Sequence, residues 1–326
     1  MILVDNEIKE VIFQMIEMYT KSRIDTMSAK SQIHGYFLLQ SCEIAKTKEQ
    51  RPFMKGVLYN QGAISFKAWD HSQAYQMLRQ QELVGQVVLV KGLVDCFNQS
   101  HSLTLDTVEQ PVQGPSYLSF LETIYDERSC WELLNQTLRR HCSQEAMQVF
   151  QLVLQDEEVR EFSVEFAAVT HHDSCKNGLL AHTAKVVHNT ELLLQYEQIM
   201  KVVDKDLLFI GAALHDIGKC VEYHRGTMSK KGTYASHLLY GPLLISRYEK
   251  QIIQLKGEAF YYGLLAIGTQ HHGVFGDSPR TLASYLVHLM DLLDTNLTDI
   301  DAQSRENKKL GVDTPLVTRD VGKLNY

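Results

Sequence analysis

Residues 210–219 read IGAALHDIGK and hold the most informative pattern of the chain. The small, apolar run before the His-Asp pair predicts a helix that packs closely against its neighbours. Consecutive helix residues point about 100° apart, so adjacent His215 and Asp216 can bind one ion only at an inward-facing corner between helices. Gly218 closes the turn, and Lys219 lies on the helical face of His215 and Asp216, where it can neutralise a phosphate oxygen or a leaving group.

Further histidines and aspartates lie in or at the ends of segments with helical periodicity. This periodicity covers nearly everything from residue 117 to 300 and predicts helices over about 143–156, 182–200, 204–216, 240–254 and 280–297. Imidazole and carboxylate ligands suit Mn, Fe, Mg or Zn, and a mixed set favours a hydrolytic centre over a closed structural site. The chemically informative residues outside the 210–219 stretch are His171, His172, His182, His237, His271, His272 and Asp291. A hydrogen-bonded core role fits His188, His224, His288 and Asp294 better than a ligand role.

The bulk composition describes an ordinary globular protein. The 326 residues are 44% hydrophobic and 22% charged, which predicts two domains. The net charge of -7 does not indicate a nucleic-acid binder, although a local basic groove would suffice. No apolar run approaches the roughly 20 residues that span a bilayer, and no secretory signal is recognisable. The six cysteines form no CxxC pair, which fits reduced thiols in a cytoplasm. The lack of a long apolar run predicts no membrane association.

The N-terminal half has a different pattern. Residues 6–21 have helical spacing and belong to an N-terminal extension, 1–30. Short β-branched and aromatic segments then predict strands at about 35–45, 53–60, 63–69, 86–95 and 101–108, with a helix at 71–81 between the third and fourth. Five strands with a helix in that position follow the order of an OB-fold, although another small barrel or an open sheet would also fit.

The turn-rich stretch 109–115 predicts an interdomain linker. We therefore expect a multidomain fold in which a small all-β, OB-fold-like barrel at 31–110 precedes an all-α domain at 117–305. A polar tail follows at 306–326.

The pattern His182…His215-Asp216…Asp291 resembles the ligand set that defines the HD superfamily of metal-dependent phosphohydrolases. An apolar helix that ends in His-Asp-Ile-Gly-Lys, with a histidine before it and an aspartate after it, makes this resemblance specific. It implies an HD-type helical domain and a bound divalent metal.

Longer runs are similar to one subgroup, the YhaM-type 3'→5' exoribonucleases, which pair an N-terminal OB-fold with an HD domain. These runs are 171–183, 271–273 followed by Ser278-Pro279, and 288–294. In the β-rich half, 64–70 resembles the strand after the first OB hairpin of that family. The similarity spans about 35 to 300.

Two positions depart from the family pattern. A histidine is expected after a Leu-Leu-Gly run, but 238–242 reads LLYGP, and His237 stands four residues before Gly241 instead. An acidic residue expected before the last ligand is missing from 281–284, which reads TLAS. The ligands of a second ion therefore differ from the family pattern.

The resemblance implies a role for each candidate residue. Asp216 would bridge two ions, with His182, His215 and Asp291 completing one site and His237, His271 and His272 the other. Mn²⁺ is the expected metal, with Fe, Mg²⁺, Ni²⁺ and Zn²⁺ as alternatives. Lys219 would stabilise charge on the phosphate. His171 or His172 would contact the substrate or protonate the leaving oxygen; alternatively, both brace the helix that carries His182.

The barrel would guide a single strand, because single strands bind by stacking on aromatic side chains along a positive groove. Candidate platforms are Phe37, Phe53, Tyr59, Phe66 and Trp69. The first hairpin supplies the basic residues Lys46, Lys48, Arg51 and Lys55. The alternative is that half of the aromatics are barrel core and the lysines form a solvated face.

These features predict a metal-dependent 3'→5' exonuclease acting on single-stranded RNA, or DNA, with the OB domain guiding the strand to a two-metal HD site. An oligomer is compatible with the sequence. One alternative is a phosphohydrolase of nucleotides or cyclic dinucleotides with a regulatory β domain. The other is a nucleic-acid-binding adaptor with a degenerate HD domain, against which the intact ligand set and Lys219 speak.

Overall fold

The computed structural model describes residues 19–97, 100–112, 114–121, 124–168, 175–272 and 276–309. Its contacts divide the chain into two units, Met1–Glu122 and Thr123–Tyr326. Most of the helix predicted at 6–21, both His171 and His172, and most of the tail at 306–326 lie outside the described residues.

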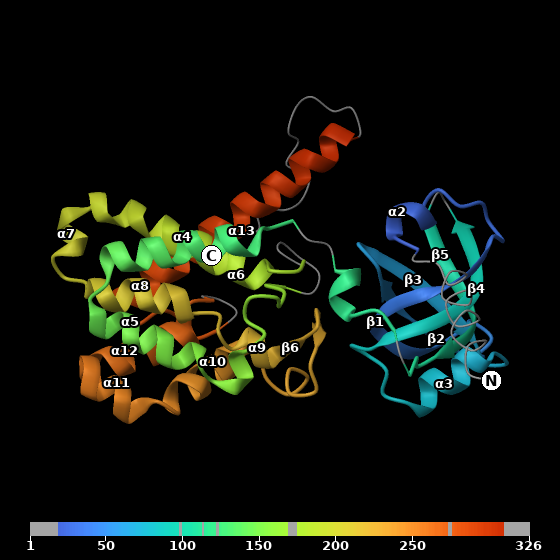
Figure 1. Ribbon diagram of the computed structural model, residues 1–326, viewed down its shortest axis with the longest axis horizontal. Helices are drawn as coiled ribbons and strands as arrows, with labels where there is room; N and C mark the ends of the chain where they lie inside the picture. The colour runs from blue at the N-terminus through green and yellow to red at the C-terminus, as the bar shows by residue number, and fades with distance from the viewer. Residues whose placement is uncertain are drawn as a thin grey trace, which may run out of the picture. The chain divides into compact units, whose positions relative to one another are not determined.

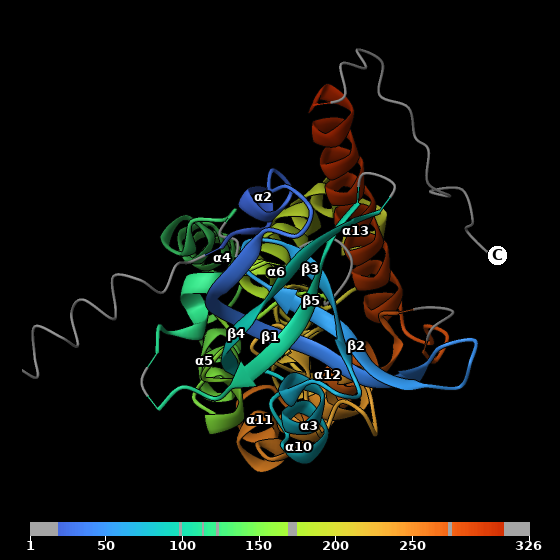
Figure 2. The same ribbon diagram turned by 90° about the vertical axis from the view of Figure 1, so that its right-hand side faces the viewer.

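The first unit is a closed barrel with the strand order β1-β2-β3-β5-β4, in which β4 pairs again with β1. Its pairs are antiparallel except for β3 with β5 (Figure 2). The strands are β1 (Gln32–Lys46), β2 (Pro52–Tyr59), β3 (Ala63–Trp69), β4 (Val87–Phe97) and β5 (Ser100–Glu109). Helix α3 (Gln73–Gln80) lies between β3 and β4 in the chain. This topology confirms the predicted OB-like barrel.

Alternation along β3 separates the barrel interior from its outer face. Ile64, Phe66 and Ala68 are buried, whereas Ser65 and Lys67 are exposed. Successive side chains of a strand point to opposite faces, so one face of β3 enters the core and the other faces solvent. The apolar and polar residues of this segment therefore fix its orientation in the barrel.

Three aromatics predicted as base platforms belong to the barrel core. Phe37 is 0% exposed, Phe66 2% and Tyr59 6%. A base cannot stack on a ring that is enclosed by other side chains, so the prediction of nucleic-acid contact is wrong for Phe37, Tyr59 and Phe66. Phe53 and Trp69 are only partly buried and retain accessible ring surface.

Two short helical segments outside the strands pack on the barrel. Helix α2 (Lys21–Ile24) is tied to it by the Lys21 amide, which donates to the Asn60 carbonyl at 2.9 Å. The 3-10 helix η1 (Tyr117–Phe120) is tied by the Gln61 amide, which donates to the Phe120 carbonyl at 2.6 Å. The sequence placed residue 117 at the start of the helical domain, whereas the contacts group η1 with the barrel.

The second unit is helical, apart from a two-stranded hairpin, β6 (Tyr223–His224) and β7 (Thr227–Met228). Its helices are α4 (Glu127–His141), α5 (Gln144–Leu154), η2 (Glu157–Val159), α6 (Gly178–Asn189), η3 (Thr190–Gln195), α7 (Glu197–Met200), α8 (Lys205–Leu214), α9 (Lys219–Glu222), α10 (His237–Ser246), α11 (Glu249–Lys256), α12 (Glu258–Gln270) and α13 (Leu282–Lys309). Among the described residues, no helix combines the length and apolarity required to cross a bilayer.

Helix α8 is the centre of this unit, because α4, α5, α6, α12 and α13 all pack against it (Figure 1). Its side chains are buried from Leu208 to Leu214, which explains why its sequence is apolar on all sides. Helix α13 extends to Lys309 rather than ending near 297 as predicted, and it projects beyond its neighbours (Figure 1). The last turns of α13 lack the apolar periodicity on which the prediction relied.

Candidate metal centre

Five helical segments bring their polar residues to one buried place. His182 lies in the middle of α6, and His215 is the C-cap residue that follows α8. His237 is the first residue of α10, and His271 is the C-cap residue that follows α12. Asp291 lies on α13. Helices α6, α12 and α13 each pack against α8, so side chains from distant parts of the chain reach the end of that helix.

The His-Asp pair occupies the corner between α8 and α9, as the sequence predicts. Gly218 makes this corner possible, because a Cβ there would overlap the backbone of His237 and of Gly241. A Cβ added at Gly241 would lie 3.5 Å from the Gly218 amide nitrogen. Gly218 thus lets α10 approach the corner closely enough for His237 to face Asp216.

The first cluster consists of His182, His215, Asp216 and Asp291. The Nε2 atoms of His182 and His215 are 3.3 Å apart, and each lies 3.4 Å from Asp216 Oδ2. Asp291 Oδ1 lies 3.2 Å from His182 Nε2 and 4.0 Å from His215 Nε2. Two ligands bound to one ion at about 2.0–2.2 Å lie between about 3 Å apart, when they are at right angles, and about 4.4 Å apart, when they are opposite each other, so these separations fit a common ion.

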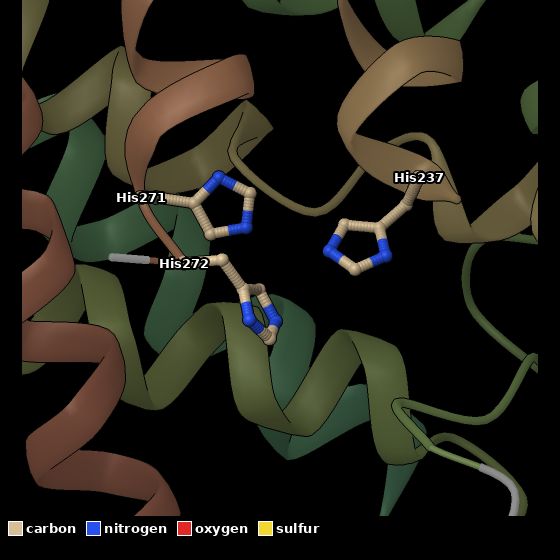
Figure 3. Close-up of side chains that lie close together, drawn as sticks. All are labelled: His237, His271 and His272. Carbon is tan, nitrogen blue, oxygen red and sulfur yellow. The ribbon is translucent and has the colours of Figure 1, made fainter. Parts of the chain in front are cut away.

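The second cluster consists of His237, His271 and His272 on the opposite oxygen of the same carboxylate. His237 Nε2 and His271 Nε2 each lie 3.4 Å from Asp216 Oδ1. The three imidazoles each offer a nitrogen within 4.8 Å of the others (Figure 3). The two oxygens of Asp216 thus face different clusters, which is the arrangement a bridging carboxylate requires.

Hydrogen bonds at Nδ1 fix which nitrogen of each ring faces the centre. The His215 ring donates to the Ala212 carbonyl at 2.8 Å, and the His271 ring donates to the Ile267 carbonyl at 3.0 Å. A carbonyl oxygen can only accept, so Nδ1 carries the proton, and Nε2 of the neutral ring presents a lone pair. His182 and His237 instead place Nδ1 on carboxylates, at 2.8 Å from Asp294 and 2.5 Å from Glu222.

Three buried atoms at this centre have no hydrogen-bond partner among the described residues. Asp216 Oδ1, His237 Nε2 and His271 Nε2 are buried and make no hydrogen bond to another described group. Buried acceptors without donors are costly, and here several lone pairs converge on one another. A divalent cation would satisfy them together, so the residues present fit the metal that the sequence predicts.

The charges around Asp216 keep its carboxyl ionised. Burial raises the pKa of Asp216. The Lys219 ammonium at 2.6 Å and the surrounding histidines outweigh burial and bring the pKa well below its usual value. Burial likewise lowers the pKa of Lys219, and the Asp216 carboxylate more than restores it. The pair therefore stays charged at neutral pH, and Asp216 keeps both oxygens able to bind a cation.

The pKa values of three histidines, His182, His237 and His272, are shifted by their surroundings. Burial lowers the pKa of His237, and burial together with neighbouring His271 lowers the pKa of His272 to about 4. His237 and His272 are therefore neutral imidazoles at neutral pH. Burial also lowers the pKa of His182, but hydrogen bonds to Asp216, Asp291 and Asp294 raise it well above its usual value. Positive charge is therefore favoured between these carboxylates.

The structure thus gathers the seven predicted ligands and Lys219, while His171 and His172 lie outside the described residues. The sequence analysis did not predict that two carboxylates, those of Glu222 and Asp294, orient the rings of candidate ligands. Glu222 carried little indication beyond being an acidic residue beside apolar Val221. Asp294 was expected to be hydrogen-bonded core, and it is buried and bonded, but its partner is a candidate ligand.

Comparison with known proteins agrees with this site. Residues 179–296 match the family model of the HD domain. The 3'-5' exoribonuclease YhaM of Listeria innocua is 24% identical over 292 residues, which cover 84% of this chain and 88% of that protein. The 3'-5' exoribonuclease YhaM of Bacillus subtilis is 24% identical over 281 residues, or 83% of this chain and 87% of that protein. These matches confirm the predicted HD domain and the resemblance to the YhaM-type proteins.

A solved structure was also compared with this chain. The second OB-fold domain of replication protein A from Methanococcus maripaludis is 11% identical to this chain, with a TM-score of 0.22. The match covers 28% of this chain and 96% of that domain.

Proposed function

We propose that this chain, in which an HD domain follows an OB-like barrel in the sequence, is a metal-dependent 3'→5' exonuclease that acts on single-stranded RNA. The observation that carries the proposal is the pair of histidine clusters on the two oxygens of Asp216, 3.4 Å from each facing imidazole nitrogen. The similarity to YhaM over 84% of the chain supplies the direction and the substrate.

The protein's own ligands would hold two divalent ions. His182, His215 and Asp291 would hold one, His237, His271 and His272 the other, and Asp216 both. When bound, such ions activate water at neutral pH and neutralise charge on the scissile phosphate. Mn²⁺ is our first choice among the metals that a mixed imidazole and carboxylate set can hold, and Fe, Mg²⁺, Ni²⁺ and Zn²⁺ are the alternatives.

The remaining groups orient this set and complete it electrostatically. The carbonyls of Ala212 and Ile267 and the carboxylates of Asp294 and Glu222 keep four rings turned toward the centre. Lys219 uses one of its three N–H donors on Asp216, and we assign the others to a phosphate oxygen of the substrate. This places a fixed positive charge where negative charge develops during hydrolysis.

The outer face of the barrel supports strand binding. Register pairs Phe53 with Trp69 and, two residues along, Lys55 with Lys67. The two rings lie 5.3 Å apart, and the two lysines are exposed. An aromatic row and a cationic row thus run side by side, roughly 7 Å apart along the strands. Bases stacking on the rings would bring their phosphates over the lysines.

A hollow of about 510 Å³ adjoins the aromatic row. It is lined by Thr47, Glu49, Arg51, Trp69, Asp70 and His71. Glu49 and Asp70 offset its arginine, so the positive charge beside the rings comes from the exposed Lys46 and Lys48 on the β1–β2 hairpin. Lys55 also pairs with Glu43 on the neighbouring strand at 2.9 Å, and a phosphate lying over Lys55 and Lys67 would compete with that carboxylate.

The proposal is tested with 5'-labelled RNA and DNA strands, single and double, incubated with the Mn²⁺-loaded full chain. We expect a ladder of products shortened from the 3' end, from single strands and not from duplex. Asp216→Asn keeps the shape of the side chain but lacks the charge, and it should lose both metal and ladder. Hydrolysis of mononucleotides without strand shortening would instead identify a nucleotide phosphohydrolase, and strand binding without any hydrolysis would identify an adaptor.

A further inference from the structure

We propose that Glu222 is the positioning residue of the second cluster and decides whether a second ion is held there, an inference that rests on the proposed function. Its carboxylate accepts two hydrogen bonds from one residue. The His237 amide donates to Oε2 at 2.8 Å, and His237 Nδ1 lies 2.5 Å from the same oxygen. Glu222 therefore fixes both the first residue of α10 and the ring it carries.

The two clusters differ in negative charge. The first has Asp291 as a carboxylate of its own and shares Asp216. The second has three imidazoles and, among the described residues, no carboxylate beyond its share of Asp216. The second cluster therefore depends more on charge supplied from behind its ligands.

Glu222 supplies that charge through the ring of His237. A carboxylate hydrogen-bonded to the far nitrogen of an imidazole makes the near nitrogen a better metal ligand. The other deeply buried ring of this cluster, His271, has a neutral carbonyl, that of Ile267, behind it. The side chain of Glu222 is 9% exposed, so solvent screens its charge little.

The first cluster contains a matched counterpart. Asp294 Oδ2 lies 2.8 Å from His182 Nδ1, and Lys185 Nζ lies 3.4 Å from the same oxygen. The lysine offsets part of the charge of Asp294, whereas Glu222 bonds His237 through both backbone and ring. Asp294→Asn and Glu222→Gln thus remove one charge each from behind different clusters.

The test is the Mn²⁺ stoichiometry and affinity of the full chain, measured by isothermal titration and by elemental analysis. Electron paramagnetic resonance distinguishes a spin-coupled Mn²⁺ pair from a single ion. We expect wild type to hold two ions and Glu222→Gln to keep the first while binding the second about 10–100-fold more weakly. Asp294→Asn should weaken the first ion instead. Glu222→Asp, which retains the charge with a shorter reach, should fall between wild type and Glu222→Gln.

Thermal melting of the metal-free variants shows whether each remains folded. If Glu222→Gln fails to fold, the inference depends on Glu222→Asp, and an unchanged second ion in that variant would overturn it. A coupled pair of unchanged affinity in folded Glu222→Gln would overturn the inference and leave the proposed function intact. A wild-type chain that binds no Mn²⁺ would overturn both.

Discussion

Gly218→Ala is the sharpest test of how the fold builds this centre. The added Cβ would lie 2.9 Å from His237 Cα and would overlap the His237 carbonyl oxygen and the Gly241 amide nitrogen. Carbon atoms in contact are about 3.5–4.0 Å apart, so the start of α10 must move by about 0.6–1.1 Å. Metal–ligand distances tolerate about 0.2 Å, so His237 should leave the second cluster.

The expected cost has two parts. Forced overpacking of this kind destabilises a protein by about 1–3 kcal/mol, which is measured as a loss in the free energy of unfolding. A displacement near 1 Å costs about 10²-fold in rate, which is measured with a labelled single strand at saturating metal. The second ion should be lost, while the first, whose ligands lie on α6, α8 and α13, should remain.

Gly241→Ala is the matched control. Its Cβ would meet the Gly218 amide nitrogen at 3.5 Å, an ordinary contact. Pro242 follows Gly241 in α10 and restricts the backbone of the residue before it. We expect Gly241→Ala to change the free energy of unfolding by no more than about 1 kcal/mol and to retain both ions. If Gly218→Ala kept two ions and full turnover, the close approach of α10 would not be what positions His237. If both variants lost the second ion equally, the effect would be one of general helix strain.

Three further predictions follow from separate contacts. Lys219→Ala should keep its metal and lose on the order of 10²–10³ in turnover, measured by elemental analysis and kcat; unchanged turnover would show that Lys219 acts only on Asp216. Trp69→Ala should weaken binding of a long single strand by about 1–3 kcal/mol in a titration at fixed salt, with little effect on a small artificial phosphodiester. Asp156 accepts from Arg247 at 3.0 Å, and although burial raises its pKa, its hydrogen bonds lower it overall. The stabilisation of the fold by ionised Asp156 is therefore complete above the ordinary aspartate pKa of about 3.9 and is lost as the pH falls below that value. Asp156→Asn should cost about 1–3 kcal/mol at neutral pH and flatten that acid limb of the stability curve.

The sequence was most informative where the pattern is local. The apolar run before His215 predicted a buried helix, and α8 is buried from Leu208 to Leu214. Alternation predicted β3 at 63–69, the bounds that the structure has. In both cases the residues that determine the structure lie within a few positions of one another.

The base platforms show where local information was not fully used. Phe66 and Trp69 are three positions apart on β3, so they point to opposite faces of the strand. Polar Ser65 and Lys67 share the outer face with Trp69, which already indicates that Phe66 points inward. Phe37 is different, because its burial results from the closure of the barrel between β1 and β4, where it pairs with Val88.

The supporting carboxylates could not be identified from spacing, because they act across the fold. Asp294 lies 112 residues from its partner His182. Glu222 lies 15 residues from His237, but the distance is closed only because α9 and α10 meet at Gly218. A carboxylate in a buried helix has many partners open to it, and only the packed structure shows which one it has.

The adjacency of His215 and Asp216 follows from the same packing. At the corner between α8 and α9, His215 turns toward α6 and α13, and Asp216 divides its two oxygens between the first cluster and the second. A carboxylate placed a full turn away would face one cluster only. Because the pair must sit where the backbone bends, the next residues must let α10 come close, and a glycine two positions later meets that need. The His-Asp-Ile-Gly-Lys stretch therefore specifies a bridging ligand, the contact that admits His237, and through Lys219 the charge that keeps the bridge ionised.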